Sequence, residues 1–148
     1  MNINLSLSPE ANLVALLNSL NDTTLVEANV AFSNVEVLVE QPTNSRVVVD
    51  VGTTPAFSGS DWLYYNRISA ANQLATNDQI EVLVTADMND AQLLAACLAK
   101  FPLHNADWRF VAAQKPANAN LPGFLAIAAK PESLLYRGEY VFKLLLSA

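Results

Sequence analysis

The sequence predicts an α+β fold in which two helices pack on an antiparallel β-sheet. Two segments have the apolar spacing of a helix, and several others alternate apolar and polar residues as strands do. An aromatic-x-glycine motif also occurs twice, at Phe57-Ser58-Gly59 and at Tyr136-Arg137-Gly138, and each copy leads into an aromatic-rich strand. The order of one helix and three strands repeats in residues 9–69 and 79–147, which indicates an internal duplication within a single domain, 1–148.

The first predicted element is a helix. Ser8 can cap its free amides, Pro9 suits the first helical position, and Glu10 suits the positive end of the helix dipole. Four leucines at helical spacing follow, and Asn21-Asp22 ends the helix. The leucines are Leu13, Leu16, Leu17 and Leu20.

The rest of the first half has the period of strands. Val35, Val37 and Val39 alternate with Glu36, Leu38 and Glu40, the period of a half-buried strand, and a phase change near Ser33-Asn34 predicts a bulge. A turn over 41–45 then leads to a strand at 46–51. A loop over 53–60 precedes a third strand at 61–69, and the glycine of the repeated motif suggests positive φ where the chain enters that strand.

The second half follows a polar connection at 70–78. Ile80, Val82 and Val84 predict a strand. Apolar residues between 93 and 101 then form one face of a helix that Pro102 stops, with N-cap candidates at Asp87, Asn89 and Asp90. Further strands are expected at 108–112, 123–129 and 139–146.

Composition and charge narrow the function. Charged residues make up 15% of the 148 residues and hydrophobic residues 52%, whereas globular domains carry about 25% charged residues. Fewer charges suit a chain that packs against neighbours. The net charge is −6 and the basic residues are scattered, so we expect neither nucleic-acid binding nor a basic membrane-surface helix. We also expect no membrane span and no signal peptide.

The residues that usually carry chemistry are sparse. Cys97 is the only cysteine and lies in an apolar run, which is typical of a buried core residue. His104 is the only histidine, so neither a histidine-based zinc site nor a catalytic triad can be assigned. We therefore predict no catalytic residues, no cofactor and no metal site. A small hydrolase remains a further hypothesis, and it would require a concave site with carboxyl groups whose pKa values are perturbed.

Aromatic residues supply the candidate interface. The strand that starts at Trp62 carries aromatic groups on both faces, so one face is expected in the core and the other in a subunit contact. The alternative is a platform on which sugar rings stack. The candidate interface residues are Trp62, Tyr64, Tyr65, Arg67 and Trp108.

The segment Tyr64-Tyr65-Asn66-Arg67-Ile68, after Phe57-Ser58-Gly59-Ser60, resembles one known family. It is similar to a domain of unknown function that recurs in virion structural proteins of large tailed bacteriophages. An apolar helix, here 93–101, and a second aromatic-x-glycine strand, here 133–141, extend the resemblance over about residues 9–147. Phe57 stands where members of that family usually have tyrosine.

The resemblance implies a role in particle architecture. We therefore expect a non-enzymatic structural subunit of a tailed-phage virion, as a capsid decoration or a tail, neck or baseplate component. It would be made in the host cytoplasm, contact other virion proteins, and assemble as a homo-oligomer or in many copies. The alternative is a module of the particle that binds glycans or the host surface through Trp62, Tyr64 or Trp108.

Overall fold

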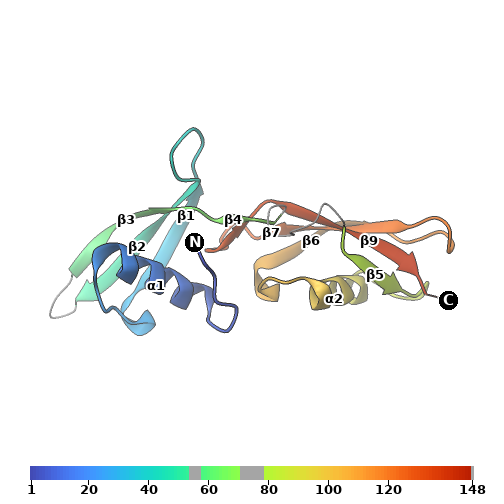
Figure 1. The fold of residues 1–148 in the computed structure, drawn as a ribbon, viewed down its shortest axis with the longest axis horizontal. Coiled ribbons are helices and arrows are strands. Elements are labelled where there is room, and N and C mark those ends of the chain that lie inside the picture. Colours follow the sequence, from blue (N-terminus) through green and yellow to red (C-terminus); the bar gives the residue numbers. More distant parts are fainter. Residues whose placement is uncertain (54–57, 71–78, 148) are drawn as a thin grey trace. The chain divides into compact units, whose positions relative to one another are not determined.

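The computed structural model describes residues 1–53, 58–70 and 79–147 (Figure 1). The chain forms two compact units, each of which combines one α-helix with a β-sheet. Unit 1 comprises Met1–Ile68 and Pro131–Tyr136, and unit 2 comprises Ser69–Lys130 and Arg137–Ala148. The predicted α+β class, with helices packed on antiparallel strands, is confirmed.

Helix α1 (Pro9–Asn21) begins and ends as its sequence predicts. The Ser8 hydroxyl accepts a hydrogen bond of 3.0 Å from the Ala11 amide, and Pro9 occupies the first turn. Asp22 ends the helix in the left-handed conformation, with φ of 53°. Leu13 lies on the buried face of this helix and is fully buried.

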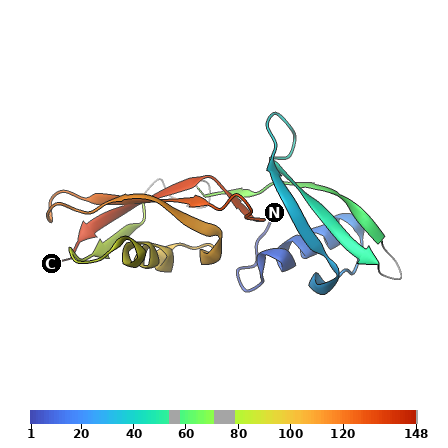
Figure 2. The same ribbon diagram turned by 180° about the vertical axis from the view of Figure 1, so that it is seen from behind.

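The sheet of unit 1 has the order β1-β2-β3, with neighbours antiparallel. Its strands are β1 (Ala31–Val37), β2 (Ser45–Thr53) and β3 (Ser58–Tyr65). The register of β1 shifts between Ser33 and Glu36, which confirms the predicted bulge. Seen from behind, α1 and these strands form two layers (Figure 2).

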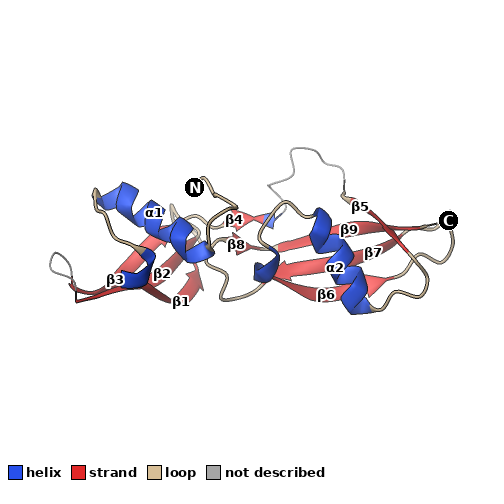
Figure 3. Cartoon of the chain, turned by 90° about the horizontal axis from the view of Figure 1, so that it is seen from below, coloured by secondary structure: helices blue, strands red, loops and turns tan. Residues whose placement is uncertain are grey.

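Unit 2 places α2 (Asp90–Lys100) against a four-stranded sheet (Figure 3). Asn89, one of the predicted N-cap candidates, caps this helix and forms a capping box with Gln92. The sheet order is β5-β9-β7-β6. Its strands are β5 (Glu81–Val84), β6 (Trp108–Gln114), β7 (Gly123–Ala129) and β9 (Glu139–Leu146).

Shorter elements complete the described chain. Strands β4 (Ile68–Ser69) and β8 (Tyr136–Arg137) form a two-stranded sheet. Two single 3₁₀ turns, η1 (Glu27–Asn29) and η3 (Asn105–Asp107), lead into β1 and β6.

Three local predictions need correction. Strand β5 runs parallel to β9, whereas we expected antiparallel strands only. The predicted strand 61–69 is broken after Tyr65, because the Asn44 side chain takes both backbone groups of Arg67, at 2.8 and 3.0 Å, in place of a neighbouring strand. Strand β3 begins at Ser58, inside the predicted loop. The remaining part of that loop, 54–57, and most of the connection 70–78 lie outside the described residues.

The two sheets share one register. In unit 1, Phe32 lies opposite Val49, which lies opposite Asp61 on the next strand. In unit 2, Phe110 lies opposite Ile127, which in turn lies opposite Tyr140. The glycine of each repeated motif lies two residues before the residue on the third strand, Gly59 before Asp61 and Gly138 before Tyr140. Both glycines have positive φ, 99° at Gly59 and 84° at Gly138. We propose that the common register reflects the duplication expected from sequence.

The two cores differ in composition. Unit 1 buries mainly aliphatic side chains, together with Tyr65 and Tyr136. Unit 2 buries a cluster of four aromatic rings, with centroids 4.9–5.4 Å apart and mostly edge-to-face. The rings belong to Phe101, Trp108, Tyr140 and Phe142.

Candidate interaction surface

The sheet of unit 1 has one face toward the core and one face toward solvent. Val47, Val49 and Leu63 point inward and are buried. Because successive strand residues point to opposite faces, the residues between them point outward. We call this surface the outer face of unit 1. It consists of Glu36, Arg46, Val48, Trp62 and Tyr64.

Arg46 organises the outer face. Its guanidinium carbon lies 4.1 Å from the centroid of the Trp62 ring, the geometry of a cation–π contact. The same guanidinium forms a 2.6 Å ion pair with Glu36, on the neighbouring strand β1. Hydrogen bonds, first to Glu36 and then to Tyr64, raise the pKa of Arg46 above its ordinary value. Arg46 thus contacts Glu36 and Trp62 directly and lies opposite Tyr64 on β3.

Tyr64 provides the most exposed aromatic surface of this face. Its side chain is 51% exposed, whereas Trp62 on the adjacent row is half-buried. Tyrosine, tryptophan and arginine are the residue types most enriched at the energetic centres of protein–protein contacts. The outer face therefore combines these three residue types on a rigid sheet.

The structure places the other candidate interface residues inside the units. Tyr65 is 3% exposed, and its hydroxyl donates a 2.7 Å hydrogen bond to the carbonyl of Leu134. Burial raises the pKa of Tyr65 to about 12. Arg67 is also buried and donates to the Ser45 hydroxyl at 2.8 Å and to the Ser133 carbonyl at 3.0 Å.

Trp108 is 3% exposed and belongs to the aromatic cluster of unit 2. Of the five candidates, only Trp62 and Tyr64 thus lie together at the surface.

Unit 2 also exposes apolar side chains on the face of its sheet opposite α2. Phe124 is 38% exposed and Val141 is 37% exposed, while their strand neighbours Leu125 and Phe142 are fully buried. Leu83 on β5 is 61% exposed. Each unit therefore has one sheet face packed on a helix and one that carries exposed large apolar residues.

The structure defines the environments of the residues whose side chains could carry chemistry. Cys97 lies on the buried face of α2 and is fully buried, and burial raises the pKa of its thiol to about 11. Asp87 accepts a hydrogen bond from the Thr85 hydroxyl, which lowers the pKa of its carboxyl group. His104 is half-buried immediately before η3.

Within residues 1–53, 58–70 and 79–147, no group of three or more His, Cys, Asp or Glu side chains is arranged to hold a metal ion. Among the helices of this part of the chain, none is long and apolar enough to cross a membrane.

Comparison with known protein families identifies the family of this chain. The model of a family of unknown function, DUF7941, matches residues 2–147. The chain belongs to this family. Comparisons of this DUF7941 member with curated proteins and with solved structures give no match.

Sequence reasoning on this DUF7941 protein missed the role of Arg46. The residue appears in the sequence only as the start of a valine-rich strand. Its contacts with Glu36 and Trp62 depend on the register of three strands, which brings together positions 10 and 16 residues away along the chain. An arginine at the start of a strand otherwise rich in valine is the only signal in the sequence.

Proposed function

We propose that this protein is a non-enzymatic structural subunit of a tailed-phage virion that acts through protein–protein contacts. The observation that carries the proposal is the outer face of unit 1, where Arg46, Trp62 and Tyr64 form a preorganised surface. Clustered exposed apolar residues on a soluble domain often mark a binding surface. The resemblance of the Tyr64–Ile68 segment to phage structural proteins supports the virion as the place of assembly.

A second apolar face on unit 2 supports assembly in many copies. Contacts between two different surfaces of identical chains generate rings when the rotation closes, or filaments when it does not. The outer face of unit 1 and the exposed residues Phe124 and Val141 of unit 2 differ in composition, so they suit a contact between unlike surfaces. Such contacts fit a capsid decoration or a tail, neck or baseplate component.

The glycan-binding alternative uses the same aromatic residues. A sugar stacks on an open ring face, but the Arg46 guanidinium already lies over one face of Trp62. This arrangement favours a protein contact. A glycan array separates the two functions: specific binding that is lost in Trp62→Ala would support the alternative.

The experiment that tests the proposal is competitive incorporation into particles. The Tyr64→Ser variant is expressed with the wild-type chain during infection, and their ratio in purified particles is measured by mass spectrometry. Val39→Ser is the control, because Val39 is 76% exposed and does not belong to the outer face. We expect Tyr64→Ser to be depleted about tenfold, which corresponds to a contact worth about 1.4 kcal/mol. Equal incorporation of both variants would contradict the proposed contact.

A further inference from the structure

Unit 1 contains a groove between its helix and one edge of its sheet. The groove has a volume of about 830 Å³, within the range of about 300–1,000 Å³ that is usual for binding sites. Leu17 and Leu20 of α1 form one wall together with Leu25. Val49 and Leu63 form the floor, and the residues 58–63 of β3 form the other wall.

The wall formed by β3 is the edge of the strand itself. All six residues from Ser58 to Leu63 line the groove, although their side chains alternate between the two faces of the sheet. The feature common to all six is the backbone. Strand β3 ends the order β1-β2-β3, and within the described residues no strand pairs with it along 58–63 on the side away from β2. An edge of this kind beside a helix is the geometry in which extended peptides add to sheets.

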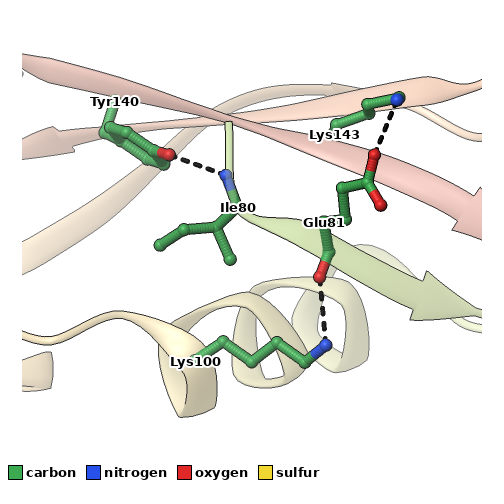
Figure 4. Close-up of polar contacts among 5 residues, drawn as sticks. All are labelled: Ile80, Glu81, Lys100, Tyr140 and Lys143. Atoms are coloured by element: carbon green, nitrogen blue, oxygen red, sulfur yellow. Dashed lines mark hydrogen bonds and ion pairs between the residues drawn. The ribbon is translucent and has the colours of Figure 1, made fainter. Parts of the chain in front are cut away.

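Unit 2 shows how the same fold holds an added strand. There β5 pairs in parallel with the edge of β9, beside α2. Figure 4 shows the contacts: the Ile80 amide donates to the Tyr140 hydroxyl at 2.9 Å, and the Lys100 ammonium donates to the Glu81 carbonyl at 3.0 Å. The Glu81 carboxylate also forms a 2.7 Å ion pair with Lys143. Side chains from the helix and from the edge strand thus hold an acidic strand in place.

The common register shows why the groove in unit 1 is open. Asp61 and Leu63 occupy the positions of Tyr140 and Phe142. In unit 2 these two rings pack with each other and with Phe101, under the sheet. An aspartate and a leucine are too small to fill that space, so a hollow remains next to the edge of β3.

The other half of the same edge is already in use. In unit 2, β5 pairs with residues 143–146 of β9. The corresponding residues in unit 1 are 64–67. There the side chains of Tyr65 and Arg67 donate to the carbonyls of Leu134 and Ser133, and the Ile68 amide, one residue beyond, donates to the carbonyl of Leu135. The backbone groups of Arg67 are bonded to the Asn44 side chain. The accessible part of the edge is therefore the segment 58–63 that lines the groove.

The charge of unit 1 indicates what kind of segment fits. Unit 1 holds eight of the 14 acidic residues and two of the eight basic residues, a net charge of −6, whereas unit 2 holds six of each. Both basic residues of unit 1 already have partners: Arg46 pairs with Glu36, and Arg67 is buried in hydrogen bonds. Asp61 is exposed and is the charged residue among those that line the groove. The edge strand of unit 1 therefore carries an acidic residue at the groove, whereas β9 in unit 2 carries the lysine that pairs with Glu81.

We propose that the groove of unit 1 binds an extended segment of a partner protein that adds as a strand to β3. Asp61 and Leu63 lie two residues apart and therefore point to the same face of β3. Every second residue of the segment enters the groove: an apolar one lies between Leu17 and Leu63, and a basic one two positions away faces Asp61. The segment runs parallel to β3, as β5 runs parallel to β9. Of the residues that define the outer face, Trp62 alone also lines this groove, and the proposal does not depend on the virion role.

The test uses a model peptide and the isolated full-length chain. An acetylated and amidated heptapeptide is titrated into ¹⁵N-labelled protein, and amide chemical shifts are followed by NMR. Its second, fourth and sixth residues are lysine, valine and lysine, and the others are threonine, so that lysine and valine share one face of the strand. We expect shifts concentrated in 17–25 and 58–63, and at least tenfold weaker binding of the matched peptide with glutamate in place of lysine. The absence of such shifts, or equal binding of both peptides, would overturn the proposal.

Two variants locate the binding. Leu20 is 60% exposed and lines the groove, so Leu20→Trp fills the groove from its rim and should abolish the shifts. Leu5→Trp is the matched control, because Leu5 is 53% exposed in unit 1 and does not line the groove. Asp61→Asn should weaken binding of the lysine peptide at least threefold. Shifts that survive Leu20→Trp, or the same shifts produced without peptide by raising the protein concentration, would contradict a partner segment as the occupant. Neither result would affect the particle experiment.

Discussion

The substitution Gly123→Ala tests the packing of the β6–β7 hairpin most severely. Gly123 begins β7, and a Cβ atom built on it would lie 2.0 Å from the backbone oxygen of Gln114. It would also lie 2.7 Å from backbone atoms of Lys115 and Pro116. All three neighbours belong to the backbone, so no side-chain rotation can relieve the contact.

The expected destabilisation follows from these distances. Ordinary contacts of a Cβ atom begin at 3.4 Å, so the opposing backbone must move by about 1.4 Å. This movement strains the pairing of Gln114 with Phe124 and of Gly123 with Leu144. Overpacking in a well-packed region costs typically about 1–3 kcal/mol and occasionally more. Because backbone must shift, we expect about 3 kcal/mol, or a fall in Tm of about 6–12 °C.

The assay is thermal and urea unfolding followed by circular dichroism. Gly59→Ala is the control, because its Cβ would have nothing within 4 Å and only its φ of 99° is unfavourable for alanine. The control should cost about 1–2 kcal/mol, within the range for strained backbone positions. The reasoning is refuted if Gly123→Ala unfolds within about 0.5 kcal/mol of wild type, or if Gly59→Ala is the more damaging change.

Three further predictions concern single residues. Gly138→Val should destabilise by about 1–3 kcal/mol through its φ of 84°, because the new Cβ finds ordinary space at 3.6 Å from Ser69 Oγ; an unchanged Tm would show that the repeated glycine is incidental. Tyr65→Phe should cost about 1–2 kcal/mol in urea unfolding, because the buried carbonyl of Leu134 loses its donor; no change in the midpoint would mean that water replaces the hydroxyl. The pKa of the Cys97 thiol is raised to about 11, above that of an exposed thiol, so the folded state keeps this proton longer. Its contribution to stability is therefore complete below about pH 9 and declines as the pH rises toward 11. Accordingly, native protein at pH 8 should react with a thiol reagent at least tenfold more slowly than protein in guanidinium, and equal rates would place the thiol at the surface.

Local signals in the sequence predicted most of the secondary structure. Ser8-Pro9 identified the start of the first helix, and the N-cap of the second, Asn89, was one of three candidates, because capping depends on neighbouring residues alone. The bulge after Ser33 was visible as a change of phase between alternating residues. The strands at 123–129 and 139–146 have the bounds that were expected from the sequence.

Features that depend on strand order were beyond the sequence. Alternation at Val82 and Val84 predicts a strand but carries no information on its direction, so the parallel pairing of β5 was missed. The sequence also could not decide which aromatic face is buried. Tyr64 and Tyr65 are adjacent, yet one is 51% exposed and the other 3%, because α1 covers only one side of the sheet. The groove beside β3 arises from what Asp61 and Leu63 fail to fill, which a sequence read position by position does not reveal.

Quantitative mass spectrometry of purified particles from the source tests the central claim most directly. A structural subunit that acts through the outer face of unit 1 must be part of the particle. We predict tens to hundreds of copies per particle, and the number would distinguish a capsid decoration from a tail, neck or baseplate component. Absence of the chain from particles, although it is present in infected cells, would contradict the proposed function.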